Sequence, residues 1–255
     1  MDSFTQFDDK NLKQVEAILL AHEIAREYFQ GELYDRDNNR LEGMTLDRQD
    51  GDVLELDGIT TGRLFMIPDG SIVWALEVGE NQDAPAGLDV QSTSPFLAED
   101  EQNSVIAFRD ETGPAMWVDA LHVRRLMLAG DAPERLGTVA FGLMAVTAYR
   151  LGFGHISLFA AGHGPLEPDD PDAFVGYDVW PKFGFDAPVA PVELNRFPEP
   201  GITASRSIQD VIMAAPQWWT EHGTGRTMHF DLSAGSRSWS ILLNYLYETL
   251  VENQP

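Results

Sequence analysis

The sequence predicts a mixed α/β fold, in which a twisted mixed sheet is flanked by helices and followed by a helical extension near the C-terminus. Two observations lead to this prediction. Short strand-like runs occupy much of residues 53–123, and the apolar pattern then changes to the period of a helix at Asp131. A strand-like run over 155–160 follows this helix. The order strand, helix, strand implies parallel pairing through a right-handed crossover.

The N-terminal half begins with an amphipathic helix and continues as strands. Apolar residues recur at helical spacing from about Asn11 to Gln30, and Gly31 can end this helix. The turn signal Asp69-Gly70 predicts a hairpin. Polar or Gly/Pro-containing loops are expected at 35–51 and 79–101, and strands at 53–56, 62–68, 71–78, 104–108 and 115–123.

The long helix after the strands has a strong start signal. Asp131, Pro133 and Glu134 provide a capping residue, a proline in the first turn and the acid of a capping box. The apolar stripe of this helix continues to Leu151, and Gly152 ends it.

The C-terminal part contains a proline-rich stretch, 188–200, which is the expected domain boundary. We expect a domain over residues 1–197 and an extension over 198–255. The extension predicts a helix with a capping box at Ser207–Asp210, a strand at 228–232 and a final helix from Ser238. Because it carries Trp218, Trp219 and Trp239, it should pack onto the main body rather than stay in water.

The charge of the chain excludes several partners. The sequence has 41 Asp and Glu against 17 Lys and Arg, a net charge of −24. Such a surface repels nucleic-acid phosphates and anionic lipid, and favours basic proteins or cationic small molecules.

Without cysteine there are no disulfides and no thiolate nucleophiles. No apolar run is long enough to cross a membrane, and the acidic N-terminus lacks the basic region of a secretory signal, so a cytoplasmic location is expected.

Two metal-site patterns begin in the sequence but are not completed. Asp35–Asn39 starts like a calcium loop, but Arg40 and Leu46 stand where glycine and a bidentate glutamate are required. His22-Glu23 starts a zincin-like run, but Arg26 stands where the second histidine should be. No metal site is therefore expected.

Residues 116–186 contain four pieces that occur in order in one enzyme family. They are a strand ending at 121–123, a helix entry at 135–140, a helix end at 149–154 followed by a strand, and the run Gly-Tyr-Asp-Val-Trp-Pro-Lys-Phe-Gly-Phe at 176–185. In this order they resemble the core of the GNAT family of N-acetyltransferases. The resemblance covers roughly 70 residues by this motif comparison.

The resemblance implies acetyl-CoA as co-substrate, with its pyrophosphate on backbone N–H groups at the helix N-terminus. The residues that it assigns to this binding are Leu121, Val123, Arg135, Gly137, Thr138 and Ala140. Thr138 stands where the family has its first glycine. Asp131 and Glu134 add two carboxylates at the same helix end. A well-capped core helix is the alternative interpretation of these carboxylates.

The resemblance also implies an acid and a base. The family's acid is commonly a tyrosine at the position of Trp180, and Tyr177, one helical turn earlier, can substitute for it. The alternative for Tyr177 is a hydrogen-bonded core tyrosine. Asp119, His122 and His163 are candidate bases, and strand alternation puts Asp119 and His122 on opposite faces.

Two functions from different classes are therefore expected. The first is an acetyl-CoA-dependent N-acetyltransferase that acts on an amine of a cationic acceptor, whether a protein, a polyamine or another small molecule. The second is a catalytically inactive GNAT-like scaffold that serves as a binding or assembly module. Trp180, Thr138 and the acidic cap formed by Asp131 and Glu134 favour the second.

Overall fold

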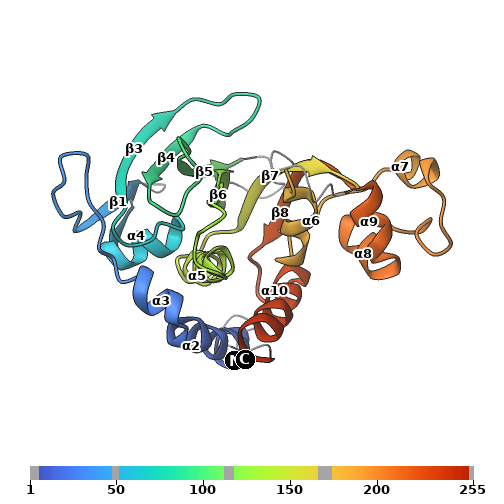
Figure 1. Cartoon of the computed structure of the whole chain (residues 1–255), viewed down its shortest axis with the longest axis horizontal. Helices are drawn as coiled ribbons and strands as arrows, with labels where there is room; N and C mark the ends of the chain where they lie inside the picture. The colour runs from blue at the N-terminus through green and yellow to red at the C-terminus, as the bar shows by residue number, and fades with distance from the viewer. Residues whose placement is uncertain (1–5, 48–51, 112–117, 166–173, 253–255) are drawn as a thin grey trace. The chain divides into compact units, whose positions relative to one another are not determined.

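The computed structural model describes residues 6–47, 52–111, 118–165 and 174–252 and has the expected mixed α/β class (Figure 1). The chain forms two compact units. The first comprises Met1–Ile156, Leu232–Ala234 and Leu246–Pro255, and the second Ser157–Asp231 and Gly235–Tyr245. The boundary expected after residue 197 falls inside the second unit.

A twisted sheet organises the first unit. Its strands pair antiparallel in chain order: β3 (Ile72–Val78), β4 (Gly87–Thr93), β5 (Asn103–Asp110) and β6 (Val118–Arg125). In the strand order β7 (His155–His163) follows β6, and the N–H of Gly154 donates to the carbonyl of Asp119 at 2.8 Å where β7 begins. The strand–helix–strand prediction is therefore confirmed. Residues 115–117 of the strand expected at 115–123 lie outside the described residues.

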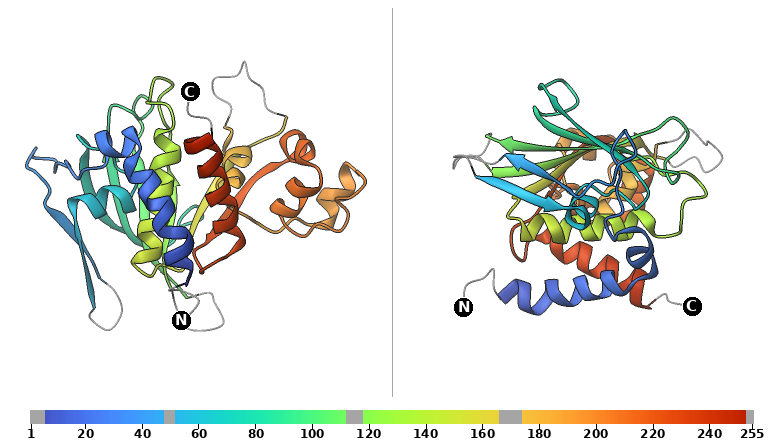
Figure 2. Two further views of the ribbon diagram at one scale, coloured as in Figure 1. Left: turned by 90° about the horizontal axis from the view of Figure 1, so that it is seen from below. Right: turned by 90° about the vertical axis from the view of Figure 1, so that its left-hand side faces the viewer.

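Helices cover one face of this sheet in layers (Figure 2). The inner layer contains α4 (Gly58–Leu64) and α5 (Leu136–Arg150), and the outer layer α2 (Lys13–Ala21) and α3 (Glu23–Tyr28). Because α5 is buried along most of its length, it needs cover on several sides. A Cβ added to Gly142 would lie 2.9 Å from Leu19, so the glycine allows α2 to approach α5 closely. None of the helices in the described ranges has the length and apolarity that a membrane span requires.

The prediction of a single N-terminal helix over 11–30 is wrong, because the helix is interrupted at His22. A π-helical turn, η1 (Asp8–Leu12), leads into α2, which ends where His22 adopts extended backbone with ψ of 140°. The Nδ1 atom of His22 then accepts the N–H of Ile24 at 3.2 Å and caps α3. The apolar pattern does not reveal the break, since buried apolar residues lie on both sides of it, Leu19 before and Ile24 and Ala25 after.

The strand predicted over 62–68 is also wrong, because residues 62–64 are the end of α4 and residues 65–68 form a turn and a loop. Asp57 caps α4 by accepting the N–H of Thr60 at 2.7 Å. The Asp69-Gly70 turn therefore joins no hairpin. The carboxylate of Asp69 instead accepts the backbone N–H groups of three residues, Gln30, Gly31 and Glu32, each at 2.8 Å.

Two strands lie in segments that the sequence predicted as loops. One is β1 (Gly43–Asp47), which pairs antiparallel with β2 (Val53–Asp57). The other is β4, whose strand alternation places Asp89 and Gln91 on one face of the sheet and Leu88 and Val90 on the other. The alternation is short, because the polar residue Ser92 falls on the same face as Leu88 and Val90.

The second unit combines strands with short helices. Its strands are most of β7 and all of β8 (Thr224–Asp231). Its helices are α6 (Gly176–Lys182), α7 (Pro191–Arg196), α8 (Ile208–Ala214), α9 (Pro216–His222) and most of α10 (Arg237–Tyr247). The π-helical turn η3 (Glu248–Glu252) that follows α10 belongs to the first unit. The indole N–H of Trp219 donates to the carbonyl of Tyr177 at 3.0 Å, and Trp239 packs against Phe230 with ring centroids 5.4 Å apart. The capping box at Ser207 and Asp210 is confirmed.

Replacing Asp69 by alanine should lower the free energy of unfolding by about 2 kcal/mol, because three backbone N–H groups lose a charged acceptor. Denaturant unfolding measures this loss. Asp37→Ala removes an exposed carboxylate of the same unit and serves as the control. Equal effects of the two substitutions would contradict the anchoring role of Asp69.

The stability contribution of Asp210 should depend on pH. A hydrogen bond from Arg237 holds the pKa of Asp210 below its ordinary value of 3.8. The N–H groups of Arg206 and Ser207 and the charge of Arg237 also lower this pKa, whereas burial raises it. A lowered folded pKa means that this contribution is present above pH 4 and is lost as the pH falls through the folded value. The difference in unfolding free energy between the wild type and Asp210→Asn should therefore shrink between pH 7 and pH 3, by denaturant titration at each pH. A difference that is the same at both pH values would contradict it.

Candidate functional site

The candidate site lies in the first unit, where the end of β6 leads into α5. Two turns connect them, with hydrogen bonds from Ala132 N–H to the Ala129 carbonyl at 3.1 Å and from Leu136 N–H to the Pro133 carbonyl at 3.0 Å. Arg135 precedes α5 in the left-handed conformation, with φ of 69°, and no side chain caps the helix. The helix start predicted at Asp131 is therefore wrong. The capping pattern is present in the sequence, but the chain forms a turn there.

The first turn of α5 presents unpaired backbone donors. The first hydrogen bond of the helix runs from Val139 N–H to the Arg135 carbonyl at 2.9 Å. The N–H groups of Gly137 and Thr138 have no acceptor within the described ranges. Since α5 has fifteen residues, its dipole adds a positive potential at this end. The arrangement can bind an anion.

The charges around this helix end have both signs. The side chain of Glu134 is 91% exposed, and its Oε1 lies 3.7 Å from Nε of Arg135. The side chain of Arg135 is 22% exposed. Burial and, more weakly, the charge of Arg135 lower the pKa of His22, against the opposing charge of Glu23. The Arg135 charge is therefore close enough to act on both α5 and the α2–α3 junction.

A β-bulge interrupts β6 just before the junction. Val123 pairs with Val105 and Arg125 with Ser104, so Arg124 has no opposite residue on β5. The guanidinium of Arg124 donates to Oδ2 of Asp89 at 3.2 Å, and the Asp89 side chain is fully buried. Leu121 and Val123, which the family resemblance assigns to acetyl-CoA binding, come directly before the bulge.

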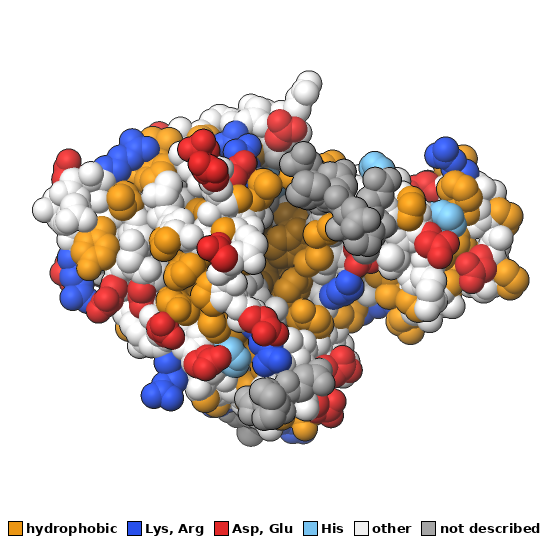
Figure 3. Space-filling view, in the orientation of Figure 1, with side chains coloured by type: hydrophobic (Ala, Val, Ile, Leu, Met, Phe, Trp, Pro, Cys, Tyr) orange, Lys and Arg blue, Asp and Glu red, His pale blue; other side chains and the backbone are white. Residues whose placement is uncertain are grey.

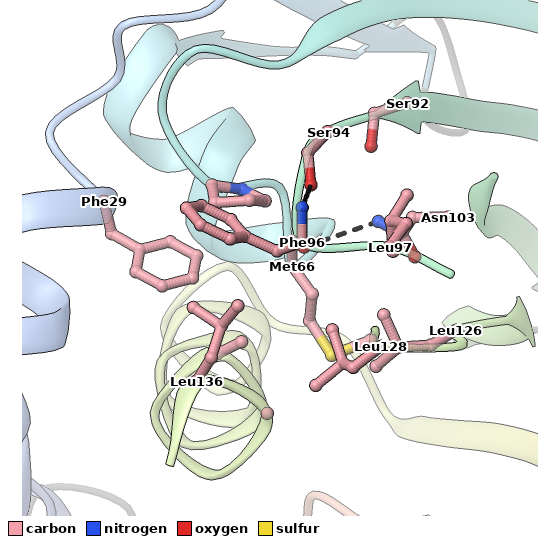
Figure 4. Close-up of a pocket in the computed structure, with 13 residues that line it drawn as sticks. Phe29, Met66, Ser92, Ser94, Phe96, Leu97, Asn103, Leu126, Leu128 and Leu136 are labelled. Atoms are coloured by element: carbon pink, nitrogen blue, oxygen red, sulfur yellow. Dashed lines mark hydrogen bonds between the residues drawn. The ribbon is translucent and has the colours of Figure 1, made fainter. Parts of the chain in front are cut away.

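A small cavity lies beneath the first turn of α5 (Figure 4). Its volume is about 10 Å³, room for one water molecule. Oγ of Ser92 and Oδ1 of Asn103 are buried at its wall, and neither has a hydrogen-bond partner in the described part of the chain. Gly137 and Ala140, two of the predicted binding residues, also line it. The structure thus brings unsatisfied polar atoms to the helix end that carries the unpaired donors.

The amide of Asn103 also holds the backbone on the other side of the cavity. Its Nδ2 donates to the carbonyl of Phe65 at 2.8 Å and to that of Met66 at 3.4 Å. Met66 has φ of 54°, a conformation that non-glycine residues rarely adopt. Asn103 and Ser92 were missed by the sequence prediction. Ser92 lies on β4, which was expected to be a loop, and the strand expected from 104 begins one residue earlier, at Asn103.

Asp119 and His122 lie on opposite faces of β6, as strand alternation predicts. Asp119 pairs with Arg109 and His122 with Ile106. Asp119 is half-buried and shares its face with Leu121 and Val123, whereas His122 is buried on the other face. One of the two candidate bases is thus aligned with the predicted binding residues.

Tyr177 and His163 belong to the second unit, and the other candidate residues to the first. The Tyr177 ring is fully buried, and its hydroxyl donates to the carbonyl of Thr220 at 2.7 Å. Burial, together with the Asp178 charge, raises the pKa of Tyr177. This is the geometry of a hydrogen-bonded core tyrosine. His163 is exposed, with Nδ1 3.1 Å from the Gly164 carbonyl.

Comparisons with known proteins add no family. Searches against family models, curated proteins and solved structures found no match to this chain. Within the described ranges, no group of three or more His, Asp or Glu side chains is placed to hold a metal ion. The site is therefore interpreted from its own residues.

Asn103→Ala should lower the free energy of unfolding by roughly 1–3 kcal/mol, because a buried carbonyl loses its donor. Ser92→Ala should leave it unchanged or raise it slightly, since the hydroxyl that it removes is buried without a partner. Calorimetric or denaturant unfolding distinguishes the two. Gln102→Ala, at an exposed neighbour, is the control. A larger loss for Ser92→Ala than for Asn103→Ala would overturn this assignment.

Proposed function

We propose that this chain is an acetyl-CoA-dependent N-acetyltransferase that acts on an amine of a cationic acceptor, whether a protein, a polyamine or another small molecule. The observation that supports the proposal most directly is the pair of unpaired N–H groups, of Gly137 and Thr138, at the N-terminus of α5. The helix follows β6 in a strand–helix–strand crossover, as in the family that residues 116–186 resemble. A diphosphate is a suitable ligand for such donors.

The residues at this helix end fit the co-substrate better than the sequence suggested. Because the helix starts at Leu136, Asp131 does not occupy its donors as a cap. Gly137 and Thr138 would bind the pyrophosphate through their N–H groups, and Arg135 would add a positive charge. The backbone of Leu121 and Val123, beside the bulge, would hold the thioester end. Acetyl-CoA supplies an activated acetyl group.

Transfer requires little else from the chain. The amine nitrogen forms a bond to the acetyl carbon, the carbon–sulfur bond breaks, and a proton passes from the amine to a base while the thiolate takes up another. Asp119 is the preferred base, because it shares a strand face with Leu121 and Val123. The hydrogen bond from Tyr177 to Thr220 counts against Tyr177 as the acid.

The acidic surface supports a cationic acceptor. The net charge is −24, and on the face of the first unit shown in Figure 3 the carboxylates are scattered rather than gathered in one patch. A diffuse negative potential attracts cations generally and repels nucleic acid and anionic lipid. It supports the charge of the acceptor and not its identity.

A second candidate function is a binding module without catalysis. The engaged hydroxyl of Tyr177 and the tryptophan at position 180 favour it, because neither side chain offers a proton to a leaving thiolate. The two candidates differ in the fate of bound acetyl-CoA. A module binds it without turnover, whereas a transferase converts it to CoA and an acetylated amine.

Acetyl-CoA should bind with an affinity that depends on the charges at the start of α5. Arg135→Gln should weaken binding, and Glu134→Gln and Asp131→Asn should each strengthen it, by about two- to fivefold, since one helix-end charge is worth about 0.3–1 kcal/mol. Isothermal titration calorimetry of the full chain measures this. Glu32→Gln, an exposed carboxylate of the same unit, is the matched control. Absence of binding at saturating acetyl-CoA, or equal affinity in all variants, would overturn the proposal.

A further inference from the structure

The first unit contains a second and much larger cleft, with a volume of about 520 Å³. This volume lies in the range of small-molecule sites. Its lining comes from β1, from strands β3 to β6 of the large sheet and from Phe153. The cleft lies at the Arg109 end of β5, whereas the small cavity under α5 lies at the Asn103 end.

The two cavities are separate sites. The small cavity is lined by the first turn of α5 and the cleft by Phe153, three residues past the end of this helix. Fifteen helical residues span about 22 Å. Because α5 packs on the sheet between them, a ligand in the cleft does not reach the N–H groups at the helix N-terminus. Asp119, the preferred base of the proposed transfer, lines the cleft and is the described residue that the two proposals share.

The charged side chains of the cleft come from different elements. Asp47 on β1, Glu77 on β3 and Asp119 on β6 contribute carboxylates. Arg109, the cross-strand partner of Asp119, is the one cation among the described residues that line the cleft. These described lining residues carry a net charge of −2. The carboxylates are too dispersed to form a metal cluster, because no such group occurs within the described ranges.

Apolar groups lie between these carboxylates. Leu46, Leu88 and Phe153 line the cleft together with the charged residues. A ligand for this surface therefore needs positive charges some distance apart and an apolar stem between them. Methylene groups against these apolar side chains would gain free energy by leaving water, and ammonium groups would face the carboxylates.

We propose that this cleft binds an aliphatic diamine or polyamine. The inference rests on the cleft and not on acetyl transfer, so the binding site stands or falls independently of the proposed function. The net charge of the chain favours a cationic partner, and the cleft is the place in the first unit where we expect this partner to bind.

The test is calorimetric titration of the full chain with 1,4-diaminobutane at low ionic strength. Binding is expected for the diamine and not for 1,4-butanediol, which has the same stem without charge. Glu77→Gln and Asp47→Asn should each weaken diamine binding by at least about threefold, as should added salt. Glu32→Gln, which removes a carboxylate outside the cleft, should leave it unchanged.

Absence of diamine binding would overturn the proposal. An equal effect of Glu32→Gln and the two cleft variants would overturn it as well, because the attraction would then be that of the net charge alone. Titration of the same variants with acetyl-CoA keeps the two proposals apart, since Glu77→Gln and Asp47→Asn should not alter acetyl-CoA binding. Loss of acetyl-CoA binding throughout, with diamine binding intact, would count against the transferase only.

Discussion

The burial of α5 is the constraint on which the first unit depends. This helix is apolar on nearly every side, so it is stable only where the sheet, α2 and α4 cover it together. The close approach of Leu19 at Gly142 fixes the distance of α2 from α5. Because its sides are covered, the helix can present polar groups only at its ends. The N–H groups of Gly137 and Thr138 lie at one such end, which is why the proposed acetyl-CoA site is placed there.

The sequence predicts the helices and strands that have local signals, such as apolar periodicity and capping residues. It misses those that depend on contacts with residues far away in the sequence. The crossover helix, the strand after it and the capping box at Ser207 follow from periodicity and capping residues. In contrast, β4 carries Asp89, whose buried carboxylate is satisfied by Ser104 and Arg124 from two other strands. No local pattern indicates such a network. The fold class is therefore predictable, but the register and two strands are not.

The same distinction applies to the candidate site. Gly137 and Ala140 were predicted from a motif, and they do line the cavity beneath α5. Ser92 and Asn103 complete it from strand positions that the sequence did not assign as binding residues. The helix start was misplaced because a left-handed residue, Arg135, begins the helix four residues after the apparent cap. Side-chain chemistry can be read from a sequence, but a single backbone dihedral angle decides which donors remain unpaired.

The cover of α5 also sets an order of events during synthesis. A Cβ at Gly142 would lie 3.4 Å from Leu246, so the C-terminal segment closes the same helix position that α2 closes from the N-terminal side. Leu246 leaves the ribosome roughly 100 residues after Gly142, which takes about 5–20 s at common elongation rates. During this interval part of the apolar surface of α5 is uncovered. The nascent first unit therefore exposes apolar surface until the second unit, which is inserted in the sequence between its parts, has been made.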